Sequence, residues 1–280
     1  MTVGIGTYCE SFQNIILAAD CRASYENPHL TPHDEMGKQF ALPFGLYADI
    51  AGYFSHCESL IAYLNSEMEQ LKDKPDILLG HFRDAIYLAQ AHELRFRVEA
   101  RFRSELSMSV EEWKQALQTP TWLPFHTRLW RRGGAIFRST RPMIELIVAG
   151  YTRDTEVLLS TAFKEPPEIE SSFVTIGSGG EDAMAHLDFR KQNPHYSFPR
   201  SVLHVAEALE KAKIDLAVGP PADYIILQRG ETRRFKARDP FVLEIIERYK
   251  NRDTAEIDND DDVRAKFKTL IYRDSSPTLS

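Results

Sequence analysis

The hydrophobic pattern changes its period along the chain, and each period predicts a different kind of element. Short β-branched runs bounded by polar turns predict strands over residues 2–9 and 13–20 and a further hairpin over 38–52. Apolar residues then recur every three to four positions, which predicts helices over 55–72 and 75–117. Strands and helices therefore come in separate groups in the first half of the chain.

The second half shows the same grouping. We expect strands, then helices, then a last apolar strand and a more polar part with one further strand and helix, over residues 143–149, 156–160, 172–176, 180–191, 201–214, 224–228 and 233–249. Ser201 is the expected N-cap of the second of these helices. Grouped strands favour an α+β fold over a parallel βαβ sheet. We predict a four-layer αββα sandwich, with two antiparallel sheets between helical layers.

Composition excludes several classes of protein. The 280 residues are 43% hydrophobic and 27% charged, which is typical of a packed globular chain and not of a disordered one. The longest uncharged apolar run, residues 15–19, is too short to cross a bilayer. The first residues lack the basic and apolar pattern of a signal peptide. We therefore expect a cytoplasmic protein with no membrane partner.

Charge and cysteine content give no indication of a cofactor. The net charge is −7, from 34 basic and 41 acidic residues, so we expect no nucleic-acid partner. Three cysteines, Cys9, Cys21 and Cys57, form no C-x-x-C pair, which argues against a disulfide framework and a zinc site. The acidic segment 258–262 lacks the glycine of an EF-hand loop. We expect no metal and no organic cofactor.

Thr2 is the first candidate for chemistry. Removal of Met1 would give Thr2 a free α-amine, and a threonine hydroxyl can be activated by such an amine. The amine suits a general base because its ordinary pKa is roughly 7.7–8.0. The alternative is that Thr2 has no catalytic role, since many chains begin with Met-Thr.

Asp20 and Lys38 are the second candidates. Asp20 ends one predicted strand, and Lys38 begins the next hairpin. A lysine near a terminal amine favours the neutral form of the amine, and a carboxylate would hold that lysine in place. The alternative is an exposed ion pair at the ends of two strands, which would contribute little to stability.

Two further candidates lie later in the chain. Ser178 belongs to the sequence GSGG between a strand and a helix, where backbone N–H groups can face an anion. This sequence matches neither the G-x-S-x-G elbow nor the P-loop. Asp215 follows a predicted helix, where it either orients a hydroxyl or amine or closes a turn.

Several segments, in order, resemble the proteasome β-subunit family of N-terminal nucleophile hydrolases. They are TVGIGTYC, IILAADCRAS, GKQFALPFGLYADIAG, MIELIVAGY, FVTIGSGGEDAMAHLD and LEKAKIDLAVGPPADYIIL. The resemblance covers roughly residues 2–230 and is greatest to the bacterial proteasome-like members. It implies a threonine peptidase acting on peptides or unfolded proteins, assembled as a homo-oligomeric ring or spiral. Whether an ATPase partner feeds it stays open.

The resemblance assigns roles to residues near the start of the chain. Thr2 aligns with the nucleophile, whose own amine serves as base. Asp20 and Lys38 align with the family's Asp and Lys, and Arg22 aligns with the Arg that supports that pair. Gly52 lies fourteen residues after Lys38, as in the family, and its backbone N–H would form the oxyanion hole.

Other assignments concern the terminal amine and the substrate pocket. Ser178 and Asp215 lie thirty-seven residues apart, matching the pair that holds the amine, but Val218 replaces the family's second Ser. Ala23 and Ile50 align with the wall of the pocket for the side chain before the scissile bond, so a preference for apolar or small side chains is implied. The first hairpin is about two residues longer than the family's, so the alignment of the nucleophile depends on where this gap is placed.

The resemblance also divides the chain. It implies a hydrolase domain over residues 1–231 and a partly flexible C-terminal extension over 232–280. An insertion at about 95–141 interleaves arginines with Phe and Trp. Such a surface binds nucleic acid or phosphate, or forms a subunit interface, and the family's assembly favours the interface. The acidic residues 258–262 could face this insertion from a neighbouring subunit.

The expected function is that of a threonine-type peptidase. Two alternatives stay open. One is a catalytically inactive scaffold subunit of the same fold. The other is an N-terminal nucleophile amidohydrolase that acts on small amides.

Overall fold

The computed structural model describes most of the chain in two compact units. The described residues are 3–20, 38–52, 54–74, 76–118, 123–140, 144–152, 156–161, 167–213, 222–236, 240–249 and 254–272. One unit comprises Met1–Phe54 and Ile144–Ser280, and the other comprises Ser55–Met143. We refer to them as the sheet unit and the helical unit.

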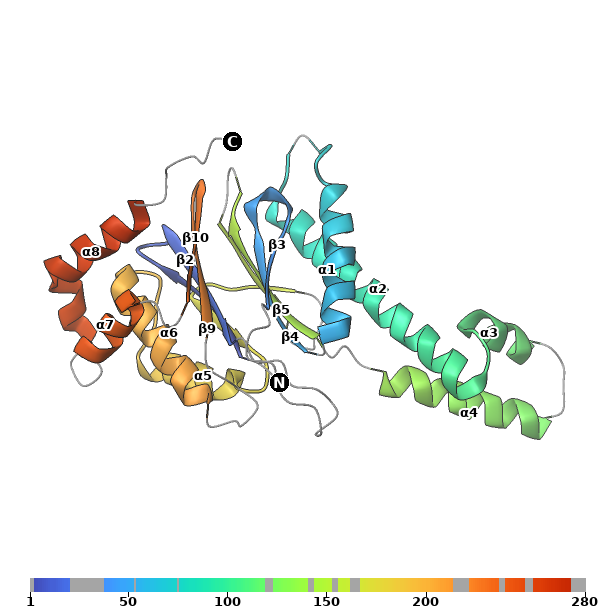
Figure 1. The fold of residues 1–280 in the computed structure, drawn as a ribbon. Helices are drawn as coiled ribbons and strands as arrows, with labels where there is room; N and C mark the ends of the chain where they lie inside the picture. Colours follow the sequence, from blue (N-terminus) through green and yellow to red (C-terminus); the bar gives the residue numbers. More distant parts are fainter. Residues whose placement is uncertain are drawn as a thin grey trace. The chain divides into compact units, whose positions relative to one another are not determined.

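Two five-stranded antiparallel sheets form the centre of the sheet unit (Figure 1). The first has the strand order β10-β9-β2-β1-β8, with β1 at Gly4–Cys9, β2 at Asn14–Asp20, β8 at Phe173–Ile176, β9 at Ala222–Gln228 and β10 at Glu231–Lys236. The second has the order β3-β4-β5-β6-β7, with β3 at Gln39–Ala41, β4 at Tyr47–Gly52, β5 at Ile144–Tyr151, β6 at Glu156–Thr161 and β7 at Glu168–Ile169. A short 3-10 helix, η1 at Pro43–Gly45, joins β3 to β4.

The two sheets pack face to face through apolar side chains. Leu17 on β2, Ile225 on β9, and Ile147 and Leu158 on the second sheet are fully buried in this layer. Gly6 on β1 allows the sheets to approach closely, because an added Cβ would lie 2.9 Å from the Leu158 side chain. Both sheets therefore bury this face, which explains the long apolar runs of their strands.

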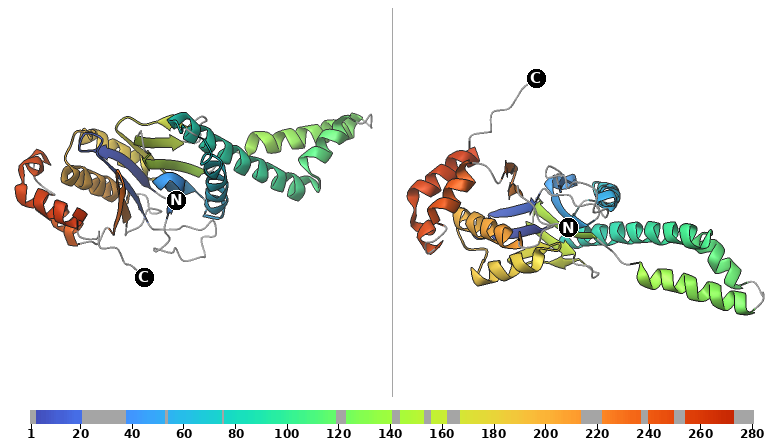
Figure 2. Two further views of the ribbon diagram at one scale, coloured as in Figure 1. Left: turned by 90° about the horizontal axis from the view of Figure 1, so that it is seen from above. Right: turned by 60° about the horizontal axis from the view of Figure 1, so that its bottom comes forward.

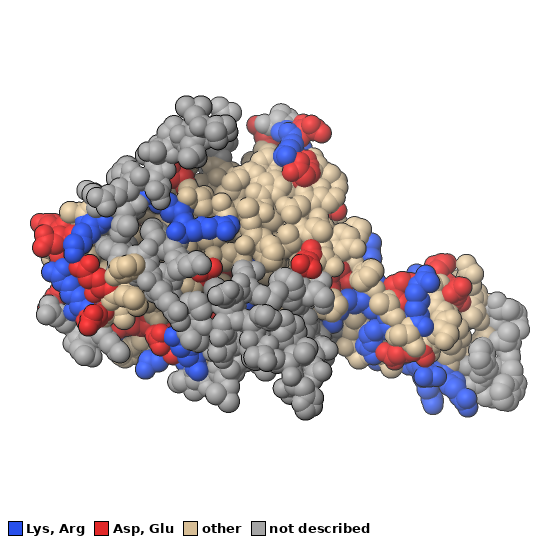
Figure 3. Space-filling view, in the orientation of Figure 1, with Lys and Arg blue, Asp and Glu red and all other residues tan. Residues whose placement is uncertain are grey.

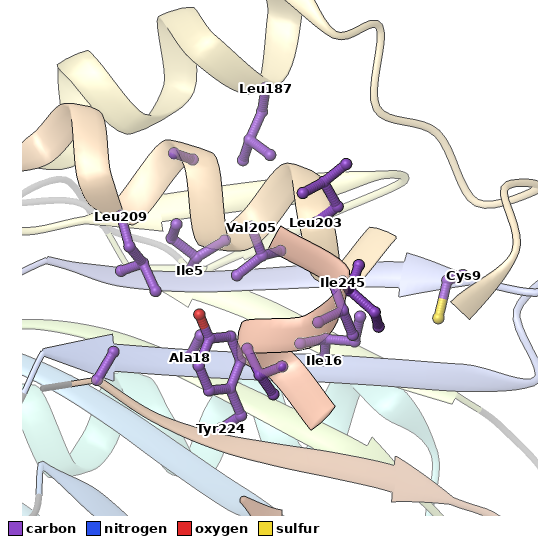
Figure 4. Packing of buried hydrophobic residues seen from close by; sticks show 14 of the residues in the cluster. Ile5, Cys9, Ile16, Ala18, Leu187, Leu203, Val205, Leu209, Tyr224 and Ile245 are labelled. Carbon is purple, nitrogen blue, oxygen red and sulfur yellow. The ribbon is translucent and has the colours of Figure 1, made fainter. Parts of the chain in front are cut away.

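Helices cover the other face of the first sheet. They are α5 at Gly180–Phe189, α6 at Phe198–Ala212, α7 at Pro240–Tyr249, η2 at Thr254–Asn259 and α8 at Asp261–Tyr272. Figure 4 shows Val205 and Leu209 of α6 and Ile245 of α7 against Ile5 and Ile16 of the sheet. In Figure 2 the helices α5 and α6 form a layer beside this sheet. The expected α+β class with two antiparallel sheets is confirmed.

The start of α6 differs from the prediction. The helix begins at Phe198, and the Ser197 side chain accepts a hydrogen bond from the Arg200 N–H at 3.4 Å. Pro199 fits the first turn, where a helix needs no N–H donor. The prediction of Ser201 as N-cap is wrong because this residue lies inside the helix and is fully buried.

Beneath α6 lies a buried network of neutral polar groups. The Gln192 amide donates to Ser201 Oγ at 3.0 Å and to Thr7 Oγ1 at 3.2 Å, and its oxygen lies 2.7 Å from His204 Nδ1. His204 Nε2 lies 3.1 Å from Thr254 Oγ1. Burial lowers the pKa of His204 to about 3, so its imidazole is neutral. The network ties η2 and α6 to β1.

The turn between β1 and β2 has an unusual backbone. Glu10, Ser11 and Phe12 have φ angles of 49°, 56° and 69°, the left-handed region that non-glycine residues rarely adopt. Two hydrogen bonds hold the turn, from Glu10 N–H to the Tyr196 carbonyl at 2.8 Å and from Ser11 N–H to the Pro194 carbonyl at 2.7 Å. Hydrogen bonds to the segment 194–196 therefore hold this turn in place.

The helical unit contains α1 at Phe54–Glu69, α2 at Leu79–Leu106, α3 at Val110–Gln118 and α4 at Leu123–Ser139. The single helix predicted over 75–117 is two helices, because Ser107 adopts a left-handed conformation with φ of 54° and ends α2. The rings of Phe102, Trp113 and Phe137 pack together with centroids 5.2–5.7 Å apart. Within the described part of the chain, no helix has the length and apolar character needed to cross a membrane.

Candidate active site

The candidate site lies where several strands of the sheet unit end together. Gly4, at the start of β1, lies opposite Ala19 near the end of β2 and opposite Ile176 at the end of β8. In the second sheet, Gly52 ends β4 opposite Ile144, which begins β5. Residues far apart in the sequence therefore meet at one end of the two sheets.

Asp20 and Lys38 form a buried ion pair at this end. Lys38 Nζ lies 3.0 Å from Asp20 Oδ1, and the side chains are 10% and 1% exposed. The same oxygen accepts a hydrogen bond from the Val3 N–H at 2.9 Å, and the Asp20 N–H donates to the Val3 carbonyl at 3.1 Å. The alternative of an exposed strand-end pair is therefore wrong. The pair is fixed to the backbone at the peptide bond that joins Val3 to residue 2.

Hydrogen bonding attaches the end of β4 to Lys38. The Ile50 N–H donates to the Lys38 carbonyl at 3.2 Å. Gly52, two residues further along, is exposed and has a φ of 147°, a backbone angle that other residues rarely adopt. The Ile50 side chain is only 2% exposed, so it is packed and faces no open space in the chain as it stands.

The turn after β8 carries Ser178. Gly177 has a φ of 89°, and its carbonyl accepts a hydrogen bond from the Gly180 N–H at 2.9 Å, which leaves Ser178 exposed between β8 and α5. Glu145, on β5, accepts a hydrogen bond from the Gly177 N–H. Burial raises the pKa of Glu145, and this hydrogen bond partly opposes the increase. Glu145 thus joins the second sheet to the Ser178 turn.

Asp49 on β4 is a second buried carboxylate near Lys38. It is 0% exposed, and within the described part of the chain neither of its oxygens accepts a hydrogen bond. Burial raises the pKa of Asp49 to about 8, while the Gln39 amide and the Lys38 charge lower it by less. At neutral pH this carboxyl is therefore largely protonated, unlike an ordinary aspartate.

Four predicted site residues lie outside the described residues. They are Thr2, Arg22, Ala23 and Asp215, and Val218 lies outside as well. Of the remaining predictions, the structure brings Asp20 and Lys38 together and places Gly52 and the Ser178 turn at the same end of the sheets. The assignment of catalytic roles stays a prediction.

Sequence reasoning missed Asp49 and Glu145. Each is the only acidic residue within an otherwise apolar strand, YADIAG and IELIVAGY. In a strand covered on both faces, such a residue must be buried, so the lone acid was the feature that could have identified both.

The groups that this site offers are charged side chains and backbone N–H groups. No group of three or more His, Cys, Asp or Glu side chains in the described ranges is arranged to hold a metal ion. The arrangement instead offers a fixed ammonium, a carboxylate that holds it and a glycine N–H at a strand end. A comparison with models of known protein families finds no match, and a comparison with curated proteins finds no similar sequence.

Proposed function

We propose that the protein is a threonine-type peptidase of the N-terminal nucleophile kind, with Thr2 as nucleophile once Met1 is removed. The observation that carries this proposal is the buried Lys38–Asp20 pair bonded to the Val3 N–H. A buried charge pair is costly to keep, and it would be replaceable by apolar residues if it served only stability. Its attachment to Val3, the residue that follows Thr2 in the sequence, supports this proposal.

The proposed reaction has two steps. The Thr2 hydroxyl attacks a peptide carbonyl carbon, and the Thr2 α-amine takes the hydroxyl proton. The Gly52 N–H donates to the oxygen that becomes negative. The C–N bond then breaks, the ammonium of Thr2 returns the proton to the leaving nitrogen, and an ester remains on Thr2. Water, deprotonated by the same amine, hydrolyses that ester and restores the hydroxyl.

The remaining residues tune the amine or shape the substrate pocket. The Lys38 ammonium disfavours a second positive charge nearby, which keeps more of the α-amine neutral and able to accept a proton. Asp20 holds Lys38 in position through the bond of 3.0 Å. In this proposal Ser178 and Asp215 hold the amine, Arg22 supports the ion pair, and Ala23 and Ile50 shape the pocket.

The proposal extends to substrate, compartment and assembly. We propose peptides or unfolded proteins as substrates, a cytoplasmic location and a homo-oligomeric ring or spiral, with an ATPase partner left open.

Helix α4 supports an interface, because it has no acidic residue and its four arginines form no ion pair within the described residues. Trp130 on the same helix is 58% exposed, and Figure 3 shows both basic and acidic side chains over this unit. Native mass spectrometry measures the assembly, and a monomer would contradict this part.

The acidic residues proposed to face that interface are partly used within the chain. Asp258 pairs with Arg200 at 2.7 Å, and Asp260 pairs with Arg248 at 3.2 Å. Asp261 and Asp262 form no ion pair within the described residues, so they are the acidic members of this segment left for a partner subunit.

Thr2→Ala tests the catalytic proposal. We expect turnover of fluorogenic peptides to fall at least about 10³-fold with no change in the unfolding midpoint, because only the nucleophile is removed. The exposed Thr232 on β10 gives a matched control, and Thr232→Ala should leave activity unchanged. Intact mass before and after a threonine-directed electrophile reports removal of Met1 and reactivity of Thr2 together.

The outcomes separate the alternatives. Retained Met1, or unchanged turnover in Thr2→Ala, would exclude this mechanism and leave a scaffold subunit of the same fold. Activity on small amides without activity on peptides, lost in Thr2→Ala, would indicate an amidohydrolase instead.

A further inference from the structure

The proposed site takes its groups from both sheets. In the first sheet, Asp20 ends β2 and Ser178 follows β8. In the second sheet, Lys38 precedes β3 and Gly52 ends β4. These groups can act on one substrate only if the two sheets keep one spacing at this end. Hydrogen bonds are directional, so polar contacts between the sheets can fix that spacing.

Two polar contacts between the sheets flank the strands that carry the reacting groups. The Lys38–Asp20 pair connects the start of β3 to the end of β2 at 3.0 Å. Glu145 on β5 accepts a hydrogen bond from the Gly177 N–H, directly after β8. The strand orders β3-β4-β5 and β2-β1-β8 place β4 and β1 between these two contacts. The proposed reaction uses the first contact and gives no role to the second.

The Glu145 side chain points from β5 toward the first sheet. Ile147, two residues further along, belongs to the apolar layer between the sheets, and alternate residues of a strand share a face. Glu145 is half-buried there, and burial raises its pKa. A carboxyl group is costly to bury, and an apolar side chain could join the same layer at a lower cost. The bond to Gly177 is what the carboxyl group provides and an apolar side chain would not.

Glu145 is also adjacent to the strand end that carries the proposed oxyanion donor. Its partner on β4 is Ala51, and Gly52 is the next residue. Partners in an antiparallel pair have their Cα atoms about 4.5–5.5 Å apart. The bond to the Gly177 N–H therefore connects the turn that carries Ser178 to a position next to Gly52.

Two further hydrogen bonds shape the Ser178 turn from within its own segment. The Gly180 N–H donates to the Gly177 carbonyl at 2.9 Å, and Thr175 Oγ1 donates to the Gly180 carbonyl at 2.8 Å. These two bonds hold the turn on β8 and α5 but do not connect it to the second sheet. Glu145 provides such a connection.

We propose that Glu145 is a positioning residue that fixes the Ser178 turn relative to the Gly52 N–H. The inference rests on the proposed function, in which Ser178 holds the Thr2 amine and Gly52 donates to the oxyanion. Without the bond to Gly177, the two groups no longer meet one reacting centre at the right spacing. The chemical step then slows, because a displacement of about 1 Å can cost about 10²-fold in rate. The pocket wall is not altered, so KM stays the same.

Two conservative variants separate the hydrogen bond of Glu145 from its charge. Glu145→Gln loses the charge but keeps a carbonyl oxygen at the same reach, so kcat should stay within about threefold of the unmodified protein. Glu145→Asp keeps the charge but is one methylene shorter, so kcat should fall about 10–100-fold with KM within about twofold. The reverse order, an active Asp variant and an inactive Gln variant, would show that the charge matters and would overturn the inference.

Glu170 gives the matched control. It is a half-buried carboxylate whose pKa is raised by burial, and it accepts a hydrogen bond from Ser160 Oγ. It follows β7, which lies three strands from β4 in the second sheet. Glu170→Asp shortens a comparable side chain and should leave kcat unchanged. An equal fall in kcat in both Asp variants would indicate a general loss of packing and would overturn the positioning role.

Selective ¹⁵N-glycine labelling tests the positioning without any activity. Gly52 and Gly177 are two of the 14 glycines, so both amides are observed in a simple spectrum. Both resonances should move in Glu145→Asp, whereas the Gly52 resonance should stay in place in Glu145→Gln and in Glu170→Asp. A Gly52 resonance that does not move in Glu145→Asp would overturn the inference.

The possible failures are distinct. Absence of any Thr2-dependent activity in the unmodified protein refutes the proposed function alone, and the glycine resonances then decide whether Glu145 fixes the spacing. Thr2-dependent activity with an unchanged kcat in Glu145→Asp overturns the positioning role alone. If Glu145→Asp does not fold, Glu145→Ala takes its place with the same expected results.

Discussion

Buried polar groups pack against both faces of β1, and they differ in whether they have hydrogen-bond partners. On the helix-covered face, Thr7 joins the network of Gln192, Ser201 and His204, in which each of these polar side chains has a partner. On the face toward the second sheet lies Asp49, which accepts no hydrogen bond within the described residues. Satisfied networks stabilise a fold, whereas an unsatisfied ionisable group is kept at a cost and points to a role in function.

The two regions also respond to pH with opposite sign. His204 has a folded-state pKa of about 3, below its ordinary value, so the unfolded chain binds the extra proton and stability falls as pH drops from about 6.5. Asp49 has a folded-state pKa of about 8, above its ordinary value, so the folded chain binds the extra proton. Its contribution to stability is present in acid and is lost as pH rises through 8. Acid therefore weakens one region and alkali the other.

The largest effect is expected from Lys38→Met. Removing the ammonium takes a compensating charge from the Asp20 carboxylate, which is 1% exposed. We expect a loss of about 3 kcal/mol in the free energy of unfolding, as for other broken buried pairs, together with loss of peptide turnover. Urea unfolding at pH 7 measures the first effect.

Lys38→Arg is the control for charge. It keeps the positive charge and should lose less than half as much stability. A loss below about 1 kcal/mol in Lys38→Met would mean that the pair behaves as an exposed one, and the contrast between the two faces would fail.

A smaller effect is expected from His204→Gln on the satisfied face. The substitution breaks the bond to Thr254 or to Gln192 and should cost about 2 kcal/mol at pH 7. It should also flatten the fall of stability between pH 6.5 and pH 4, because His204 is no longer present to titrate. Peptide turnover per folded molecule should be unchanged. A change in turnover would show that this face also serves the reaction.

The smallest effect is expected from Gly4→Ala, which tests the close packing on the face of β1 that lies toward Asp49. The added Cβ would meet Ile176 at 2.8 Å, so we expect a loss of about 1–2 kcal/mol and a shift of the Val3 N–H away from Asp20. Gly80→Ala in α2 is the matched control, because nothing lies within 4 Å of its added Cβ, and it should gain about 0.5 kcal/mol. Thermal unfolding of both variants shows which one loses stability. Equal changes in the two variants would contradict the close packing at Gly4.

The sequence allowed the fold class to be predicted because alternation and helical period were both strong. The hairpins at 2–20 and 38–52 were confirmed as the strand pairs β1–β2 and β3–β4. The break between α2 and α3 was missed, since it depends on the left-handed backbone of Ser107, a residue type that is common inside helices as well. The cap of α6 was misplaced because two serines four residues apart, Ser197 and Ser201, are equally plausible caps from sequence alone.

The site was only partly predictable for a similar reason. Asp20 and Lys38 could be paired from the family resemblance, and the structure adds that their carboxylate also binds the Val3 N–H. Asp49 stands out as the lone acid of its strand, but alternation alone would place such a residue on a solvent face unless both faces are covered. Coverage of both faces is a tertiary property, and it depends on the packing of one sheet on the other.

The left-handed turn at Glu10–Phe12 has a consequence for the opposite end of the hairpin. Adding or deleting one residue there would slide β2 by about 3.3 Å along β1 and turn its side chains to the other face. Asp20 would then no longer reach the Val3 N–H, which it meets because Gly4 lies opposite Ala19. The length of this turn thus sets the register that brings Asp20 to Val3, although the turn lies at the other end of the hairpin. Its backbone hydrogen bonds to Tyr196 and Pro194 hold the turn in place.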